Sequence, residues 1–332
     1  MKAAVLGTGS WGTALAQVLA DNGNETVLWG RNQQETDDIN LNHHNMKAFP
    51  DPLNPSLTAS TAMHCIQDAD LLLAAVPTSA IETVLNQAIA CLDHPVIVIN
   101  VAKGFHPVTH ERMSVFIHRI MPAQYVKAIV SLIGPSHAEE VIQRKLTAIN
   151  AVSEDEEAAR IIQQLFSNDY FRVYRNTDVI GTEIGAALKN IMAIASGILE
   201  GIGQGDNARA ALMTRGLAEM ERYGVAFGAH PETFLGLDGV GDLIVTCTSR
   251  LSRNFMAGYQ IGIENSADHF MKTNTKTVEG LSACRIVYEE VKERHIDMPI
   301  TTAVYHVLYE NSIPDQEITA LMHRDLKSEE QR

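Results

Sequence analysis

The first half of the chain alternates short apolar runs with helix-length segments. The runs are almost continuously apolar, which is typical of strands buried on both faces of a parallel sheet. They lie at residues 2–6, 26–29, 70–76, 96–101, 128–133, 148–152 and 171–174. Helical spacing of apolar residues appears between several of them, at 11–21, 80–91 and 154–166. This alternation predicts an α/β domain with a doubly wound, mostly parallel sheet of Rossmann type.

The pattern changes after about residue 175. Residues 179–202 form one long stretch with apolar positions at i, i+3 and i+4 spacing, and further helical patterns lie at 208–227, 253–263, 279–294 and 301–309. We find no convincing strand in this half. We therefore expect a Rossmann-type domain over residues 1–177 and an all-helical domain over 178–332. The polar stretch 265–276 has no assignable fold, and the tail 327–332 is expected to fray.

The charge of the chain limits its partners. Forty acidic side chains face 26 basic ones, which gives a formal net charge of −14. Such a surface repels nucleic acid and anionic membranes, so we expect neither as a partner. A phosphate site must then be a local exception, built from a few basic residues and backbone N–H groups.

The cysteine pattern and the N-terminus indicate a reducing compartment. The four cysteines, Cys65, Cys91, Cys247 and Cys284, form no CxxC pair, and no histidines accompany them at metal-binding spacing, so we expect reduced thiols and no metal site. The first residues do not resemble a signal peptide, and no run of 18 apolar residues predicts a membrane-spanning helix. A cytoplasmic protein is expected.

A glycine-rich motif, GTGSWG, occupies residues 7–12. It follows the first apolar run directly and opens a helical pattern, which is the context that a dinucleotide-binding loop requires. Gly7 would allow the tight turn, Gly9 would let the backbone approach a pyrophosphate, and Gly12 would let the helix pack closely on the strand. The free N–H groups at the helix start would hold the phosphates. The alternative is an ordinary glycine turn.

The end of the second apolar run bears on cofactor choice. NAD-selective sites place an acidic residue about 20 positions after the glycines, whereas Arg31 stands there in this chain. An arginine can pair with the 2′-phosphate of NADP, so we expect NADP(H) to be accepted and preferred. The alternative is that Arg31 is a solvated loop residue.

Two further apolar runs end near residues that could contact a ligand. We expect the strand at 70–76 to end at Pro77 and the strand at 96–101 to lead into Lys103. Ligands of open α/β sheets bind outside the carboxyl ends of the strands, so both residues are candidates for cofactor or substrate contact. Lys103 as a plain surface lysine remains an equal alternative.

Lys189 lies inside the most apolar helical pattern, with the small residues Gly185 and Ala186 one turn away. Burial there would lower the pKa of the lysine, and a lysine near neutrality can take a proton from a substrate hydroxyl. The pattern alone favours the alternative, in which the side chain reaches along the helix to water.

Two short clusters in the second half are also candidates. Asp242 lies in the glycine-rich stretch GVGDL (239–243), where it could orient a catalytic lysine or act as a helix N-cap. The triplet Ser252, Arg253 and Asn254 precedes a helical pattern and could hold a phosphate, although an isolated triplet is a weak signal.

Together these motifs resemble the bacterial NAD(P)-dependent glycerol-3-phosphate dehydrogenase family. The resemblance extends from the first strand to about Glu310, and the order and spacing of the motifs make it specific. The motifs are GTGSWGTALA, WGR, the VP at 76–77, AKG at 102–104, GPSHAEE at 134–140, EIGAALKN at 183–190, GVGDLIVTCTS at 239–249, SRN at 252–254 and VEG at 278–280. Thr277 departs from the family, which often has an apolar residue there.

The resemblance implies a role for each matching residue. Lys189 is the proton acceptor. We expect two further catalytic residues: Lys103, which would stabilise the charge on the substrate oxygen, and Asp242, which would orient Lys189. Cofactor contacts, which include the loop glycines and Pro77 argued above, are Gly7, Gly9, Ser10, Trp11, Gly12, Arg31, Pro77, Lys103, Ala138, Arg253 and Glu279. Substrate contacts are Lys103, Gly134, Ser136, Lys189, Asp242, Thr246, Ser252, Arg253 and Asn254.

The implied reaction is reversible hydride transfer between glycerol 3-phosphate and dihydroxyacetone phosphate, with NADP(H) or NAD(H) as cofactor. The resemblance also implies that the product feeds phospholipid synthesis, and a homodimer is common for such folds. Two other readings stay open. One is a related two-domain dehydrogenase of the β-hydroxyacid or 6-phosphogluconate type, and the other is a module that binds NADP without turnover.

Overall fold

The computed structural model of the protein describes residues 1–326 and 328–329. The chain divides into two compact units, Met1–Val179 and Ile180–Arg332. Four residues of the tail for which fraying is expected, 327 and 330–332, lie outside the described residues. The two units are described separately below.

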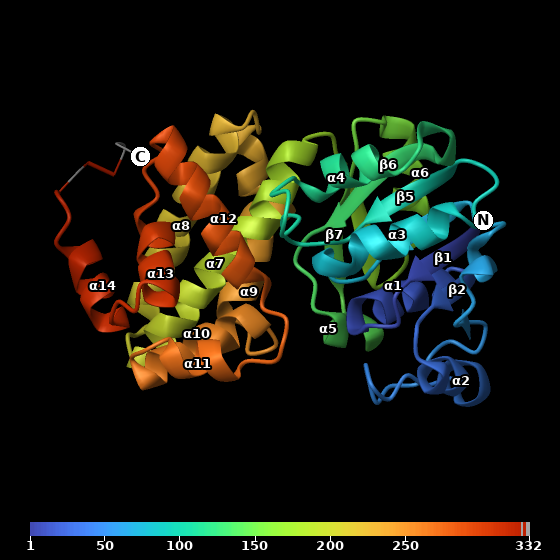
Figure 1. Ribbon diagram of the computed structural model, residues 1–332, viewed down its shortest axis with the longest axis horizontal. Helices are drawn as coiled ribbons and strands as arrows, with labels where there is room; N and C mark the ends of the chain where they lie inside the picture. The colour runs from blue at the N-terminus through green and yellow to red at the C-terminus, as the bar shows by residue number, and fades with distance from the viewer. Residues whose placement is uncertain (327, 330–332) are drawn as a thin grey trace. The chain divides into compact units, whose positions relative to one another are not determined.

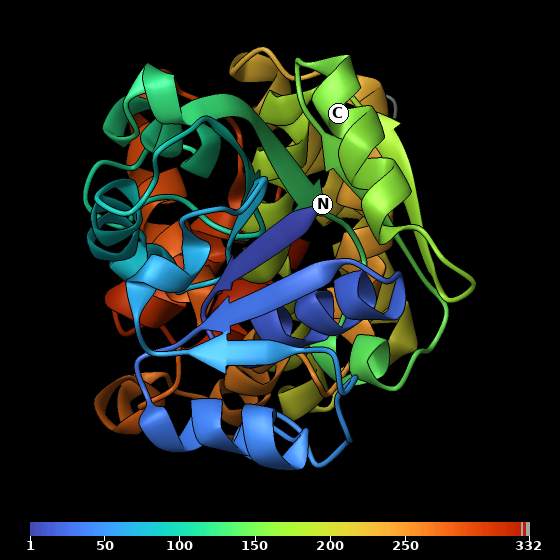
Figure 2. The same ribbon diagram turned by 90° about the vertical axis from the view of Figure 1, so that its right-hand side faces the viewer.

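The first unit is built on one eight-stranded sheet with the strand order β3-β2-β1-β4-β5-β6-β7-β8. All neighbouring strands are parallel except β6 and β7, which are antiparallel. Figure 2 shows β1 and β2 side by side at the N-terminal part of the sheet. The strands are β1 (Lys2–Leu6), β2 (Glu25–Trp29), β3 (Thr58–Ser60), β4 (Leu71–Ala74), β5 (Val96–Asn100), β6 (Val126–Ile133), β7 (Thr147–Val152) and β8 (Phe171–Asn176).

Helices cover both faces of this sheet, as the continuous apolar strands predict (Figure 1). Along β1, Ala3 and Val5 join the apolar core on one face, and Ala4 and Leu6 join the core on the other. The helices are α1 (Ser10–Asp21), α2 (Gln33–Asn42), α3 (Ile81–Ile89), α4 (Met113–Ile120), α5 (Ala138–Ile142) and α6 (Glu156–Phe166). The Rossmann-type fold class is therefore confirmed.

The chain order creates a switch point beside β1. The chain runs from β1 to β2 and β3 on one side, and then crosses to β4 on the other side of β1. Open α/β sheets bind ligands at such a point, outside the carboxyl ends of the strands. The glycine-rich motif follows β1 directly, so the fold places it at this point.

The second unit is helical throughout its described residues, as expected (Figure 1). The helices are α7 (Val179–Ile202), α8 (Asp206–Ala226), α9 (Asp242–Thr248), α10 (Arg253–Glu264), α11 (Asp268–Thr273), α12 (Glu279–Arg294), α13 (Pro299–Tyr309) and α14 (Pro314–Met322). By length and composition α7 could cross a membrane, but 89% of its most apolar window is buried within the protein. That burial is typical of the central helix of a helical domain.

Glycines let α7 and α10 approach at backbone distance. A Cβ on Gly197 of α7 would lie 2.0 Å from the carbonyl oxygen of Phe255, and one on Gly258 of α10 would lie 2.0 Å from that of Ile194. Neither position has room for any other residue. The contact fixes α10, whose first turn carries Arg253 and Asn254, against the helix that carries Lys189.

Several elements differ from the sequence prediction. The strand expected at 70–76 ends at Ala74, and Pro77 instead precedes a 3-10 turn at Thr78–Ala80. The short strand β3 was not predicted, and neither were helices α2, α4, α5, α9, α11 and α14. Helix α11 lies within the polar stretch 265–276. Most of these elements are short and bury few apolar residues, so the sequence shows too little periodicity to predict them.

The α7–α10 contact predicts the stability of a glycine variant. Gly258→Ala should lower the free energy of unfolding by about 1–3 kcal/mol, because a methyl group there overlaps backbone atoms. Gly236→Ala is the matched control, since Gly236 has an extended backbone with φ −94° and its Cβ would lie 3.4 Å from the nearest atom. Denaturant unfolding of both variants checks this. Equal stabilities would contradict the close packing.

Candidate functional site

The glycine-rich loop has the geometry of a phosphate cradle. Gly7 has φ +118°, a conformation that favours glycine, and a Cβ on Gly12 would lie 2.4 Å from the Gly7 carbonyl oxygen. Helix α1 begins after Gly9, and no side chain caps its first N–H groups. A Cβ on Gly9 would meet no atom within 4 Å, so the space over the loop is open. These features fit a bound dinucleotide, whose pyrophosphate would accept from the uncapped N–H groups.

The residues beside this loop include the predicted Ser10, Trp11 and Arg31. Ser10 and Trp11 form the start of α1, and both are half-buried. Trp11 Nε1 is buried without a hydrogen-bond partner among the described residues. Arg31 is exposed between β2 and Asn32, the N-cap of α2. Its position at the end of β2 suits a contact with the adenosine ribose, and the reading as a solvated loop residue stays open.

Lys103 meets two of the predicted substrate contacts. Its Nζ donates to the carbonyl oxygen of Gly134 at 2.8 Å and to Ser136 Oγ at 3.3 Å. Gly134 is held in a glycine conformation with φ +150°, and its Cβ would lie 2.8 Å from Ile149 Cα. Ala138 begins α5 two residues after Ser136. The half-buried Lys103 is thus anchored, which contradicts its reading as a plain surface lysine.

In the helical unit, Lys189 is buried with only 4% of its surface exposed. Its Nζ donates to Asp242 Oδ1 at 2.8 Å and to Thr246 Oγ1 at 2.7 Å. The expectation that Lys189 reaches along the helix to water is therefore wrong. A carboxylate at this distance stabilises a charged ammonium against the cost of its burial.

Asp242 is not a helix N-cap. Gly241 is the N-cap of α9, and Asp242 is its first residue, with its carboxylate turned to Lys189. Thr246 lies one turn further along α9 and donates to the backbone carbonyl oxygen of Asp242 at 2.6 Å. The hydroxyl of Thr246 therefore accepts from Lys189 while its proton is held by the backbone.

The segment 238–246, which carries Asp242 and Thr246, packs against one face of α7. Thr182 Oγ1 donates to Asp238 Oδ2 at 2.7 Å, and a Cβ on Gly185 would lie 2.7 Å from the Asp238 carbonyl oxygen. Thr182, Gly185 and Lys189 are three and four residues apart, so they lie on the same face of α7. The docked segment includes a π-helical turn, Leu237–Gly241, a type of irregularity frequent at functional sites. No role was predicted for Thr182 or Asp238.

A second cluster joins three helices through Asn254. Its side-chain amide donates to Asn190 Oδ1 at 2.9 Å, and its oxygen accepts from the Gly280 N–H at 2.8 Å. Asn190 follows Lys189 on α7, and Gly280 follows Glu279 at the start of α12. One amide N–H of Asn254 remains for a ligand. Asn190 was not predicted, although it lies in the quoted EIGAALKN motif.

The remaining predicted residues lie at the starts of α10 and α12. Ser252 is the N-cap of α10 and accepts from the Phe255 N–H at 3.2 Å. Arg253 is exposed in the first turn of α10. Burial raises the pKa of Glu279, and the nearby positive charge of Arg253 opposes the rise. Arg253 and Glu279 therefore lie within electrostatic range of each other.

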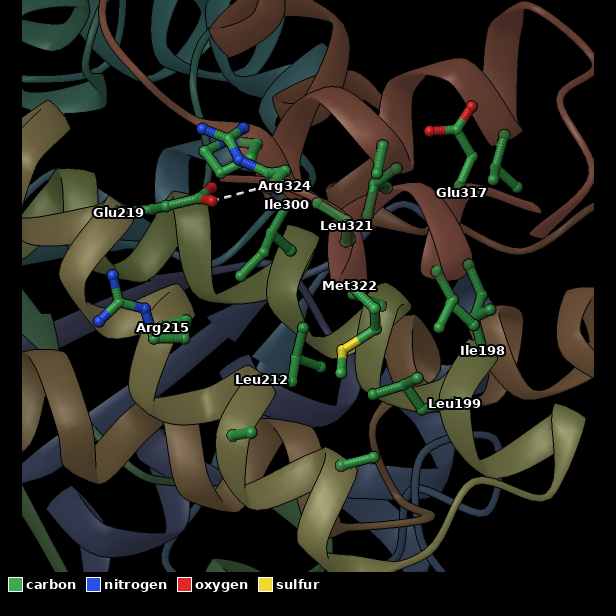
Figure 3. A pocket seen from close by; sticks show the side chains of 18 of the residues that line it. Ile198, Leu199, Leu212, Arg215, Glu219, Ile300, Glu317, Leu321, Met322 and Arg324 are labelled. Carbon is green, nitrogen blue, oxygen red and sulfur yellow. Dashed lines mark hydrogen bonds between the residues drawn. The ribbon is translucent and has the colours of Figure 1, made fainter. Parts of the chain in front are cut away.

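A cavity of about 460 Å³ opens elsewhere in the helical unit, beside α7, α8, α13 and α14 (Figure 3). Apolar side chains such as Leu199 and Leu212 line it, with Arg215 and Glu219 on one wall. Glu219 accepts from the Ile300 N–H at 2.6 Å. No predicted site residue lines this cavity.

The sheet with its open glycine loop and the helical unit with its buried lysine define a nucleotide-dependent dehydrogenase. Residues 2–159 match the N-terminal family described as NAD-dependent glycerol-3-phosphate dehydrogenase, and residues 178–319 match the corresponding C-terminal family. The chain belongs to the NAD-dependent glycerol-3-phosphate dehydrogenase family. It is therefore an NAD(P)-dependent oxidoreductase, which excludes the reading as a module without turnover.

Similar proteins support this assignment over the whole chain. Glycerol-3-phosphate dehydrogenase (NAD(P)+) of Enterococcus faecalis is 48% identical over 99% of this chain and 97% of its own, and that of Streptococcus uberis is 47% identical over 99% and 98%. The crystal structure of glycerol-3-phosphate dehydrogenase from Coxiella burnetii has a TM-score of 0.87 at 33% identity and covers 97% of this chain and 99% of its own. The family match over both halves of the chain thus favours this family over the reading as a β-hydroxyacid or 6-phosphogluconate dehydrogenase.

The buried ion pair predicts a large stability effect. Asp242→Ala should lower the free energy of unfolding by about 3–5 kcal/mol, because it leaves the buried Lys189 ammonium without its counter-charge. Asp268→Ala is the control, since its pair with Lys272 is exposed and 3.9 Å long. Its loss should cost about 1 kcal/mol or less. Urea unfolding measures both, and a cost for Asp242→Ala no greater than the control would contradict the buried pair.

Proposed function

We propose that the protein interconverts glycerol 3-phosphate and dihydroxyacetone phosphate, with NADPH or NADH as the reductant. The observation that carries this proposal is the buried Lys189 ammonium, held by Asp242 and Thr246. A poised proton donor on a rigid helix suits the reduction of a carbonyl group, where a proton must reach the new alkoxide. The names of the relatives supply the substrate class.

The first unit would hold the nucleotide. Its pyrophosphate would lie against the first turn of α1, at Ser10 and Trp11, with Gly7, Gly9 and Gly12 giving the backbone room. Arg31 would bind the adenosine end. Further contacts are proposed for Pro77, Lys103, Ala138, Arg253 and Glu279. When bound, the nicotinamide supplies the hydride that reaches C2 of the substrate.

Lys189 would handle the proton. In the reducing direction its ammonium donates a proton to the oxygen on C2, and in the oxidising direction the neutral amine takes that proton back. Asp242 favours the charged form and fixes the position of Nζ, and Thr246 holds it from a second direction. Because both partners lie on α9, the amine has little rotational freedom, and the proton is delivered without reorganisation.

The substrate phosphate needs a local positive site on this acidic chain. Arg253 is the exposed cation at the start of α10, beside Ser252 and the remaining N–H of Asn254. We propose that these residues bind the phosphate, and that Lys103, Gly134 and Ser136 also contact the substrate. Binding energy from a phosphate remote from C2 helps to fix the reacting carbon.

We place the protein in the cytoplasm, as a homodimer, with a product that feeds phospholipid synthesis. Free thiols at all four cysteines support a reducing compartment. Size-exclusion chromatography with light scattering would test the dimer.

Lys189→Met should lower kcat by about 100- to 10,000-fold, because the reaction loses its proton donor. NADPH binding should remain, since the nucleotide lies against the sheet. Lys272→Met, at an exposed lysine of α11, is the control and should keep wild-type turnover. NADPH oxidation with dihydroxyacetone phosphate measures kcat. Wild-type kcat in a folded Lys189→Met protein would remove Lys189 from this role.

Arg31→Glu should weaken NADPH binding relative to NADH binding. A carboxylate repels the 2′-phosphate and can accept from the 2′-hydroxyl of NADH. We expect the ratio of the two dissociation constants to shift by at least about ten-fold, or about 1.4 kcal/mol. Fluorescence titration of both nucleotides measures the ratio. An unchanged ratio would mean that Arg31 does not contact the 2′-phosphate.

A further inference from the structure

A buried carboxylate connects the glycine-rich loop to the turn after α2. Glu35, in the first turn of α2, accepts from Thr8 Oγ1 at 2.6 Å and from Lys47 Nζ at 2.5 Å. Thr8 stands between Gly7 and Gly9, and its side chain lies so close to Gly30 that a Cβ there would be 2.5 Å from Thr8 Cγ2. The three side chains therefore meet where β1 and β2 both end.

This position is the adenosine end of a dinucleotide site. In Rossmann-type folds an acidic group near the end of the second strand bonds the ribose 2′-hydroxyl of NAD. Here the nearby Glu35 is only 10% exposed at its side chain, and each of its oxygens already accepts a bond. Although burial raises the pKa of Glu35, the bonds from Lys47 and Thr8 outweigh burial and hold that pKa below its usual value. The carboxylate is thus ionised and occupied.

Lys47, in contrast, is bound to Glu35 but remains open to solvent. Its side chain is 74% exposed although Glu35 binds its ammonium. An ammonium has three N–H donors, so two remain for a ligand. The exposed Arg31 lies four residues before Glu35, at the start of the same segment. On a chain whose net charge is −14, this region therefore carries two exposed cations, Lys47 on Glu35 and Arg31 just after β2.

The backbone that carries Lys47 is fixed in place. Asn45 Nδ2 donates to the Thr8 carbonyl oxygen and to Thr13 Oγ1, both at 2.9 Å. The Asn45 carbonyl oxygen accepts from the N–H of the buried Phe49 at 2.8 Å, which closes a turn around Lys47. With the backbone fixed and the ammonium bound to Glu35, less of Lys47 has to be ordered when a ligand arrives, which lowers the entropic cost of binding.

We propose that Lys47 is a second cation of the 2′-phosphate site and, with Arg31, sets the preference for NADP(H) over NAD(H). Glu35 holds Lys47 near the ribose. Because both of its oxygens already accept hydrogen bonds, Glu35 does not bond the 2′-hydroxyl of NAD(H). This inference rests on the proposed function, because it assumes that the glycine-rich loop holds the nucleotide.

Lys47→Met tests the proposal. We expect it to weaken NADPH binding about ten-fold and to leave NADH binding within about two-fold, because only NADPH carries the 2′-phosphate. Tryptophan fluorescence titration gives both dissociation constants without turnover. The fragments 2′,5′-ADP and 5′-AMP, which lack nicotinamide, should show the same difference.

Two variants serve as controls. Lys127→Met removes an exposed lysine at the start of β6, a strand separated from β2 in the sheet by β1, β4 and β5, and should not change the ratio. Lys47→Arg keeps the cation and should keep most of the preference. A purely structural role of Lys47 predicts instead that both nucleotides weaken equally.

The outcomes separate the inference from the function on which it rests. Wild-type protein that binds neither nucleotide would overturn the proposed nucleotide site. A second outcome is that the wild-type protein binds both nucleotides, while Lys47→Met leaves the ratio of the two dissociation constants unchanged, either with no weakening or with equal weakening of both. That outcome would overturn the role of Lys47 alone.

Discussion

The helical unit depends on one buried ion pair, between the Lys189 ammonium and the Asp242 carboxylate. Burying two charges is costly, and the cost is recovered only when geometry and further hydrogen bonds are good. The fold meets this condition by docking the segment 238–246 along one face of α7, where Thr182 and Gly185 set the distance. The bond from Thr246 completes the environment of the amine. The structural constraint and the proton donor that we propose thus share the same contact.

The sheet unit solves a different electrostatic problem. A chain with a net charge of −14 must bind ligands that carry several phosphates. The uncapped start of α1 offers backbone N–H groups, which attract an anion without any charged side chain. The positive side chains that we propose for phosphate binding are Arg31 after β2, Lys47 in the turn after α2 and Arg253 at the start of α10. In this proposal phosphate binding is local, while the net charge of the chain stays negative.

Much of this architecture could be predicted from the sequence. Continuous apolar runs located seven of the eight strands, since strands buried on both faces leave a strong signal, whereas the three-residue β3 did not. The glycine motif gave the loop, because its residue types are required by its backbone. The motif resemblance gave Lys189 and Asp242, while periodicity alone favoured a solvated lysine and left the N-cap reading of Asp242 open.

The contacts between distant polar residues could not be predicted in this way. Thr8, Glu35 and Lys47 are joined only because α2 and the turn after it fold back on the glycine loop, and no periodicity marks that return. The bridge from Asn254 to Asn190 and Gly280 likewise joins three helices. Such bonds depend on tertiary geometry and not on local residue type.

The reaction proposed for this chain transfers a hydride to C2 of a three-carbon ketone phosphate. The most direct measurement uses NADPH deuterated on the transferred C4 position, with dihydroxyacetone phosphate, followed by mass spectrometry of the product. We expect glycerol 3-phosphate with one deuterium, on C2. Product without deuterium, or no product at all, would contradict it.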